Sequence, residues 1–276
     1  MVGKITPTVD MLHQKCHGHP AGRPSRHALV WHRGVIMAQH RHIQPGSGRA
    51  SGGGRPDATH YLAVIGDLRG SRQLPDRRAV QERLRSALEL LDRRFSGDLA
   101  AGFAITTGDE FQALLTSPAV GLEVVVACEE ALEGLDLRYG LGWGTLATRL
   151  EPTAVGMDGP CFHAAREAID GAKETGRWLG ARGFGAEADQ VLDGVLGLIG
   201  AVRQEWTELQ ARAVAMRRRV ETQREIARRL SVDPSTVSKR LKSALYDEVV
   251  AAEQAAAHLL DRFGAEAAAR AGAWPA

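Results

Sequence analysis

The sequence has few of the features that mark secreted and membrane proteins. Its only cysteines are Cys16, Cys128 and Cys161, and their spacing shows no pairs. A disulfide framework is therefore not expected, which favours a reducing compartment. No apolar run approaches the ~20 residues that a membrane-spanning helix needs. His and Arg interrupt the apolar stretches near the N-terminus, so no signal peptide is predicted. We expect a cytoplasmic protein without a membrane partner.

The net charge is also small, +2 at pH 7, but the charges are unevenly distributed. Residues 1–60 carry a net charge of +6, residues 61–202 carry −7, and residues 203–242 carry +6. An acidic middle segment repels nucleic acid, whereas the basic block after it attracts it. The length of the chain is enough for two folded domains.

Residues 1–59 show no sustained apolar period and hold seven of the ten histidines. This composition predicts a disordered leader, and a misassigned translation start would explain the segment equally well. His13, Cys16, His17 and His19 are possible metal ligands. No second ligand pair stands at a spacing that would close a fold, so chance clustering of histidines is the favoured interpretation.

Residues 60–183 alternate between strand and helix patterns. The expected elements are a strand at 61–67, a helix from Asp76 to about Phe95, a strand hairpin over 101–115, a helix from Ser117-Pro118 to about Glu133, a strand at 137–146 and a helix at 160–175. Glycines in the last strand are placed where another backbone approaches closely. This order predicts an α+β, ferredoxin-like sheet domain. Residues 184–276 read as an all-α domain.

Two aspartates mark strand ends of this sheet. Asp67 ends the first strand, and Asp109 lies in the hairpin between the second and third strands, about forty residues later. In a split βαβ sheet the first and third strands are neighbours, so both carboxylates would reach one edge. Such oxygens suit Mg²⁺, which keeps phosphates as partners. Gly66, Gly70 and Ser71 leave room for backbone amides to approach a triphosphate. The alternative is that both aspartates are solvated turn residues.

Three motifs carry a family resemblance. VIGDLRGS, TTGDEFQALL and RYGLGWGTL together resemble the metal-binding strand, central hairpin and glycine-rich strand of class III nucleotidyl cyclases and GGDEF proteins. The chain is more similar still to the SatD family, through IGD…GSR, GDEFQ, a GMDGP-like segment and a C-terminal helix-turn-helix, over about 61–247. The resemblance implies a palm-like sheet in which Asp67 and Asp109 hold metal ions that bind a nucleoside triphosphate. The candidate nucleotide-binding residues are Gly66, Leu68, Gly70, Ser71, Arg72 and Gly108.

The departures from the cyclase pattern concern catalysis. Arg166 can take the place of the transition-state arginine, but the position four residues earlier is Phe162, and a one-residue slip gives His163. Cyclases carry Asn there, and they use a base-selecting Lys that the second strand lacks. Because losing one such group costs about 10²–10³ in rate, we expect binding of a metal–nucleotide without turnover. Glu110 is expected only to flank the hairpin, and Asp158 and His163 remain open between structural and functional roles.

Residues 222–246, TQREIARRLSVDPSTVSKRLKSALY, have the pattern of a helix-turn-helix. The apolar residues expected to face its core are Ile226, Ala227, Leu230, Val232, Val237 and Leu241. Asp233 or Ser235 can cap the second helix. The pattern resembles region-four-type modules of sigma factors. The alternative is a polar helical hairpin with no DNA partner.

The second helix would place its outward face in the major groove of double-stranded DNA. The residues of that face are Ser235, Thr236, Ser238, Lys239 and Lys242. The flanking residues suited to phosphates are Arg224, Arg228, Arg229 and Arg240. An apolar stripe follows within residues 247–263, and it is either core or a dimer contact. The stripe consists of Val249, Val250, Ala257 and Leu260.

The sequence therefore predicts a homodimeric transcription regulator whose sheet domain senses Mg²⁺ and a nucleotide. An active nucleotidyl cyclase or related phosphotransferase with an accessory helix-turn-helix is the main alternative. A protein-interaction scaffold built on the same sheet is the third.

Overall fold

The computed structural model describes residues 59–70, 76–106, 108–219 and 222–272, which belong to one compact unit. The expected leader lies outside the described residues, apart from residue 59. The same holds for its candidate metal ligands, His13, Cys16, His17 and His19. No helix in the described part of the chain is both long and apolar enough to cross a membrane.

The protein is α+β, as predicted. The strands are β1 (His60–Leu68), β2 (Leu99–Ile105), β3 (Glu110–Leu115), β4 (Leu137–Thr145) and β5 (Leu179–Arg182). The helices are α1 (Arg77–Arg94), the 3₁₀ turn η2 (Pro118–Val120), α2 (Gly121–Ala131), α3 (Pro160–Thr175), α4 (Ala186–Gln204), α5 (Glu208–Arg218), α6 (Gln223–Leu230), α7 (Pro234–Ser243) and α8 (Tyr246–Gly272).

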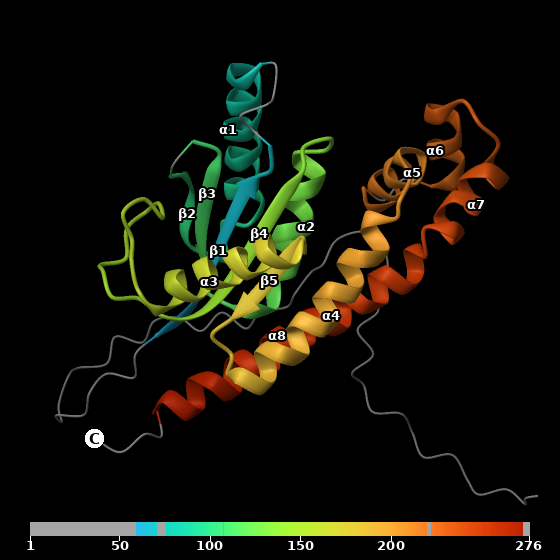
Figure 1. Cartoon of the computed structure of the whole chain (residues 1–276). Coiled ribbons are helices and arrows are strands. Elements are labelled where there is room, and N and C mark those ends of the chain that lie inside the picture. The colour runs from blue at the N-terminus through green and yellow to red at the C-terminus, as the bar shows by residue number, and fades with distance from the viewer. Residues whose placement is uncertain (1–58, 71–75, 107, 220–221, 273–276) are drawn as a thin grey trace, which may run out of the picture. The chain divides into compact units, whose positions relative to one another are not determined.

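The strands form one mixed sheet in the order β2-β3-β1-β4-β5 (Figure 1). β1 lies antiparallel between β3 and β4, so the first and third strands are neighbours, as expected. β5 is parallel to β4 and was not predicted. Its four residues include Gly180 and Ala181, which carry no strand pattern. The pairing with β4 therefore makes this segment a strand, because strand formation depends strongly on neighbours.

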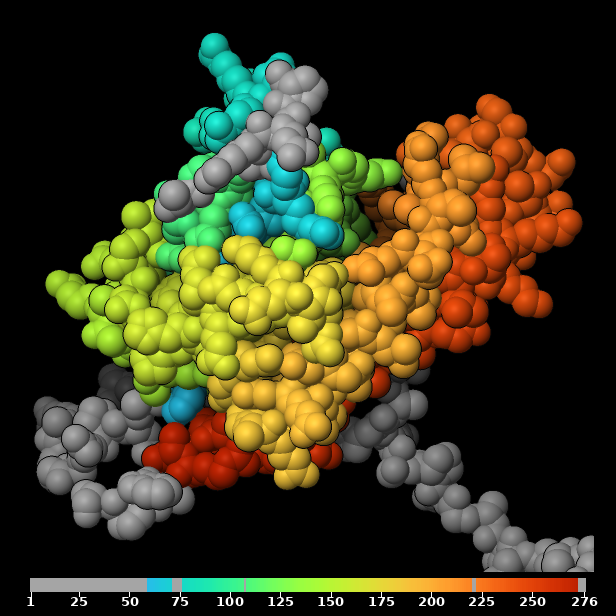
Figure 2. Space-filling view, in the orientation of Figure 1, coloured from blue at the N-terminus to red at the C-terminus, as the bar shows by residue number. Residues whose placement is uncertain are grey.

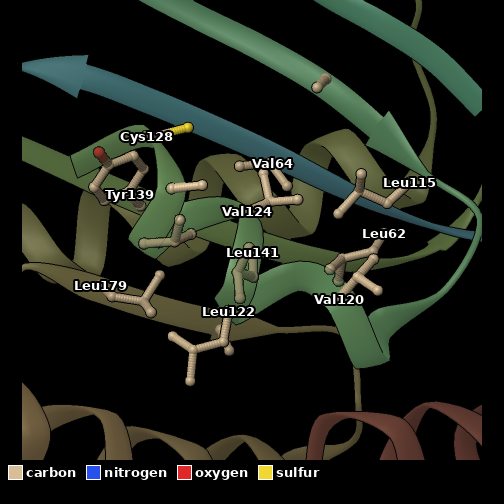
Figure 3. Close-up of a cluster of buried hydrophobic side chains, with 14 of the residues drawn as sticks. Leu62, Val64, Leu115, Val120, Leu122, Val124, Cys128, Tyr139, Leu141 and Leu179 are labelled. Carbon is tan, nitrogen blue, oxygen red and sulfur yellow. The ribbon is translucent and has the colours of Figure 1, made fainter. Parts of the chain in front are cut away.

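Both faces of the sheet are covered. Leu62 and Val64 of β1 pack with α1 and α2 in the larger core, part of which Figure 3 shows. The alternate residues Ala63 and Ile65 pack with α3 residues such as Ile169 in a second core. A strand buried on both faces carries apolar residues at successive positions. This explains why β1 reads as an uninterrupted apolar run.

Two helix starts can be compared with the sequence expectation. Asp76 caps α1, and its carboxylate accepts a hydrogen bond from the backbone N–H of Ala79 at 3.0 Å, as predicted. The hydroxyl of Ser117 likewise accepts from Ala119. Pro118 begins the 3₁₀ turn η2 instead of α2, which extends only from Gly121 to Ala131. Such turns are common at helix N-termini.

The glycines of β4 bring α3 directly onto the sheet. A Cβ at Gly140 would overlap the backbone of α3 at Ala165, and one at Gly142 would overlap the backbone at Ala165 and Cys161. The predicted close approach of another backbone is therefore confirmed, and α3 supplies that backbone. The helix packs here without intervening side chains.

The helices after β5 pack onto the sheet and onto one another. α4 and α8 run side by side (Figure 1), and α8 also contacts η2 and α2. The indole N–H of Trp143 in β4 donates to the carbonyl of Gly264 in α8 at 3.0 Å. Val249 and Leu260 are buried in the main core, so these members of the apolar stripe are core residues. Helices α5, α6 and α7 share a separate small core.

Candidate functional site

Charged side chains form a row across three strands, near the end of β1. Asp67 of β1 lies opposite Glu110 of β3 on one side and Arg138 of β4 on the other. Directly opposed residues of antiparallel strands point to the same face. This is the face that α3 covers, because Asp67 alternates with Ala63 and Ile65.

Helix α3 contributes further charged side chains to this row of strand residues. Arg166, Asp170 and Lys173 stand at positions i, i+4 and i+7, which share one side of a helix. Arg166 donates to both carboxylate oxygens of Glu110, at 2.5 and 2.6 Å. Lys173 Nζ lies 3.3 Å from a carboxylate oxygen of Asp67 and 3.6 Å from one of Asp170. We refer to the following residues as the strand-end cluster: Asp67, Glu110, Arg138, Arg166, Asp170 and Lys173.

The pKa of Glu110 reflects these contacts. Burial acts to raise it, but the hydrogen bonds and charge of Arg166, with smaller contributions from Thr106 and Lys173, together outweigh burial and lower the pKa. The pKa of Arg166 is raised, mainly by its hydrogen bonds to Glu110. Both groups are therefore charged at neutral pH. This bidentate pair links α3 to the start of β3.

Asp109 has a different environment from Asp67. It lies in the β2–β3 hairpin beside Gly108, whose φ of +67° lies in the left-handed region that favours glycine. Its carboxylate is 3.7 Å from a guanidinium nitrogen of Arg77 in α1. The partner of Asp67 is Lys173 in α3, on the other side of the sheet.

Whether Mg²⁺ fits here depends on the oxygen atoms that Asp67 and Asp109 offer and on where these two carboxylates lie. Within the described ranges, no group of three or more His, Cys, Asp or Glu side chains is placed to hold a metal ion. Asp67 and Asp109 offer carboxylate oxygens, which Mg²⁺ prefers, but two carboxylates do not complete its shell. Mg²⁺ usually retains water and takes phosphate oxygens as further ligands. The two carboxylates, which pair with helices on opposite faces of the sheet, therefore do not by themselves form a Mg²⁺ site.

The candidate nucleotide-binding residues near Asp67 have local structural roles. A Cβ at Gly66 would overlap the ring of Phe111, so this glycine is required by packing within the sheet. The Leu68 side chain is buried in the core, which leaves only its backbone for a ligand. Gly70 has a φ of +66° and allows the turn after β1. The candidates outside the described residues are Ser71 and Arg72.

Asp158 and His163, whose roles the sequence left open, form a pair at the start of α3. Nε2 of His163 lies 2.8 Å from a carboxylate oxygen of Asp158, and both side chains are largely exposed. The carbonyl of Asp158 also accepts from the backbone N–H of Ala147 at 2.9 Å. These contacts support a structural role in the connection that precedes α3.

Sequence reasoning missed most of the strand-end cluster. Glu110 does more than flank the hairpin, because it binds Arg166 and lies opposite Asp67. The spacing of Arg166, Asp170 and Lys173 was a readable signal for one charged helix face. Their meeting with β1 and β3 depended on the strand register.

The α6–α7 hairpin, residues 222–243, is the second candidate site. A capping box starts α6: the Thr222 hydroxyl accepts from the backbone N–H of Glu225, and the Glu225 carboxylate accepts from that of Thr222. The helix ends at Ser231, which has a φ of 52°. Asp233 is the N-cap residue of α7 by position, but its side chain makes no capping hydrogen bond.

The inner and outer faces of this hairpin differ sharply. The expected inward residues are all buried or partly buried in one core with α5: Ile226, Ala227, Leu230, Val232, Val237 and Leu241. The expected DNA-facing residues that are exposed are Arg224, Arg228, Arg229, Ser235, Ser238, Lys239 and Lys242. Those that are half-buried are Thr236 and Arg240. The hairpin thus presents a polar, cationic surface over an apolar core.

Comparison with known proteins places these features in a family. The model of the SatD family matches residues 61–260, from β1 into α8. The match covers most of the chain and includes both the strand-end cluster and the α6–α7 hairpin. No curated protein matches the chain. The chain therefore belongs to the SatD family.

Proposed function

We propose that this protein is a DNA-binding transcription regulator in which the α6–α7 hairpin is a helix-turn-helix. The observation that carries the proposal is the division of the hairpin into a shared apolar core and an exposed cationic surface. A DNA-reading helix needs its partner helix to hold it rigidly while its outer side chains stay free for base edges and phosphates. Lys239 and Lys242 of α7 are exposed in this way.

The first expected result concerns DNA affinity. Lys239→Ala should weaken specific binding by about 1–3 kcal/mol, because Lys239 is assigned to a base edge. Arg228→Ala should weaken binding to all sequences and reduce the slope of log affinity against log salt by about one, because it is assigned to a phosphate. Fluorescence anisotropy with a selected genomic fragment and a random duplex, over a salt series, measures both.

The control for charge is Arg262→Ala, which removes an exposed arginine of α8, sixteen residues after the start of that helix at Tyr246. It should leave both affinity and salt slope unchanged. Equal, salt-insensitive losses for Lys239→Ala and Arg228→Ala would contradict the assigned roles.

We propose further that the sheet domain, residues 60–183, is a cyclase-like sensor for a nucleoside triphosphate with Mg²⁺. The antiparallel order β2-β3-β1-β4 supports a ferredoxin-like sheet, the architecture implied by the resemblance to cyclases. Asp67 and Asp109 would hold the ion. Lys173 and Arg77, which pair with these aspartates, would supply positive charge for phosphates.

A nucleoside triphosphate should therefore raise the Tm only when Mg²⁺ is present. A ligand at a hundredfold excess over its Kd stabilises the native state by about 2.7 kcal/mol. For a chain of this size that corresponds to about 5–10 °C in Tm. Asp67→Asn and Asp109→Asn should each abolish the increase, whereas Asp261→Asn, at an exposed position of α8, should retain it. Absence of nucleotide binding to the wild type by calorimetry at millimolar concentration, with Mg²⁺ or Mn²⁺, would refute the sensor.

Turnover is the alternative activity for the same site. Arg166, the residue matched to the transition-state arginine of cyclases, is bound to Glu110 through both terminal nitrogens. This engagement favours binding over catalysis. Chromatography after incubation with nucleoside triphosphates and Mg²⁺ separates the two, because only an active cyclase releases a cyclic nucleotide and pyrophosphate.

A further inference from the structure

The outer face of α4 carries no charge between Glu187 and Glu205, although α4 lies at the surface of the face that Figure 2 shows, in golden yellow to orange. Surface helices normally place charged and polar residues on their outer side. Leu198, in the middle of this face, is 69% exposed, the largest exposed fraction of any large apolar residue in the described part of the chain. The exposed residues of α4 after Glu187 are Gln190, Val191, Gly194, Leu198, Ala201 and Gln204.

Apart from Glu187 in its first turn, the charged residues of α4 are paired within the protein. The carboxylate of Asp189 accepts hydrogen bonds from two backbone N–H groups, at 2.9 and 3.3 Å. That of Asp193 accepts from Arg182 at 2.9 Å, and Arg203 donates to Glu253 at 3.1 Å. These charges therefore serve the contacts of α4 with the rest of the chain and leave its outer face apolar.

The apolar residues of this face have the spacing of a helix–helix contact. Val191, Val195, Leu198 and Val202 stand at positions i, i+4, i+7 and i+11, which are the a and d positions of two heptads. Val191 is exposed, whereas Val195 and Val202 are half-buried against the main core. A seam with this spacing fits a second helix along its length.

The same face carries a projection and a notch one turn apart. Leu198 projects, whereas Gly194 has no side chain, and a Cβ added there would have no atom of the described residues within 4 Å. Consider a two-fold axis that crosses α4 midway between these two residues. It places each Leu198 over Gly194 of a second copy, and each Val191 over the small Ala201 of that copy. Such self-complementarity is what an isologous interface requires.

We propose that α4 is the contact surface of a homodimer, in which the α4 helices of two copies pack antiparallel with Leu198 of each seated on Gly194 of the other. A second copy is the occupant because the face is complementary to itself and has no charge in its middle to select an oppositely charged partner. The stripe of α8 that the sequence offered as a dimer contact has Val249 and Leu260 in the core. The homodimer expected from the sequence therefore needs a different surface.

The length of the face sets the strength of the contact. From Glu187 to Glu205 the helix rises by about 27 Å. A contact through one helix of this length lies at the low end of the size range of specific interfaces, where association is weak and transient. The dissociation constant should accordingly be roughly 10 µM to 1 mM.

Acidic residues stand at the two ends of the face. The rotation that seats Leu198 on Gly194 brings Glu187 of one copy beside Glu205 of the other, and both are exposed. Like charges in water repel weakly, and salt screens them. The dimer should therefore tighten as NaCl is added, whereas an interface held by ion pairs would weaken.

The dimer bears on the proposed DNA binding but does not depend on it. Dimeric helix-turn-helix proteins read two half-sites related by the two-fold axis of the protein. A two-fold contact at α4 would relate the two α6–α7 hairpins in this way. The test below uses the protein without DNA, so its result is independent of whether the hairpin binds DNA.

Analytical ultracentrifugation of the full chain, up to about 1 mM, should show a reversible monomer–dimer equilibrium. Leu198→Glu places a charge in the centre of the contact and should weaken the dimer at least tenfold. Its Tm should stay unchanged in dilute solution, because the side chain is exposed. Leu90→Glu is the matched control, since Leu90 is 57% exposed on α1 and lies off the face. It should dimerise as the wild type does.

A second pair of variants tests the antiparallel arrangement. Glu205→Lys should tighten the dimer by about three- to tenfold, because two rim repulsions become Glu–Lys pairs. Were the helices parallel, Lys at position 205 would meet its own copy and bring no gain. Glu89→Lys, the same charge change at an exposed position of α1, should have no such effect.

Three outcomes would overturn the proposal. The first is a wild-type protein that stays monomeric up to about 1 mM, the limit of weak specific association. The second is dimerisation of Leu198→Glu as strong as that of Leu90→Glu, which would place the contact elsewhere. The third is a dimer that Glu205→Lys fails to tighten, which would exclude the antiparallel packing of α4.

Discussion

Replacing Gly142 with alanine is expected to lower the free energy of unfolding by about 3 kcal/mol, near the upper end for overpacking. The added Cβ would overlap the backbone of α3 at Ala165 and Cys161. A backbone cannot move aside as a flexible side chain can, so α3 would have to shift away from β4. For a chain of this size the loss corresponds to about 6–12 °C in Tm, measured by thermal or urea unfolding.

Gly194→Ala is the matched control, because it makes the same chemical change but is expected to raise the free energy of unfolding. Gly194 lies within α4, and an added Cβ would have no atom within 4 Å. Alanine stabilises an exposed helix position by about 1 kcal/mol relative to glycine. Similar small effects at both glycines would show that α3 does not pack on β4 as closely as described.

Glu253→Gln is expected to destabilise the protein by about 3 kcal/mol, because it leaves two arginines without their shared carboxylate. Only 10% of the Glu253 side chain is exposed, and its partners Arg203 and Arg218 are 12% and 13% exposed. Charges this well removed from water depend on pairing. Urea unfolding at pH 7 measures the loss, and the amide side chain keeps the size of the glutamate.

The control lies in the same helix. Glu266 forms an exposed i,i+4 pair with Arg262, the two side chains being 49% and 65% exposed. Glu266→Gln should cost less than about 0.5 kcal/mol, because water screens exposed pairs. The double variant Glu253→Leu, Arg218→Met should recover much of the single-variant loss, since apolar residues of similar size can replace a buried pair. A loss at Glu253 no larger than that at Glu266 would contradict the role of the buried network.

Several elements follow from local patterns in the chain. The sequence alone predicts the uninterrupted apolar run of β1, the Asp76 cap of α1 and the inward-facing positions of α6 and α7. Each depends on neighbours within a few residues, through the period of a strand or helix or through a capping side chain. The glycines of β4 also signalled a close backbone contact, although not its partner.

Other features depend on long-range pairing. The strand register, not the spacing in the GDEF motif, places Glu110 opposite Asp67. Packing of α8 against α4, η2 and α2 makes core residues of Val249 and Leu260, which the sequence left open between core and dimer contact. β5 became a strand only through its pairing with β4.

The same division applies to the sites. The outward residues of α7 could be predicted because one helix and its turn fix which side chains face away from the core. The strand-end cluster could not, because it brings together residues from several elements distant in the chain. Helix and strand periods specify which face a residue occupies. The packing of complete elements against one another decides which faces meet, and this packing is set by side chains throughout the chain.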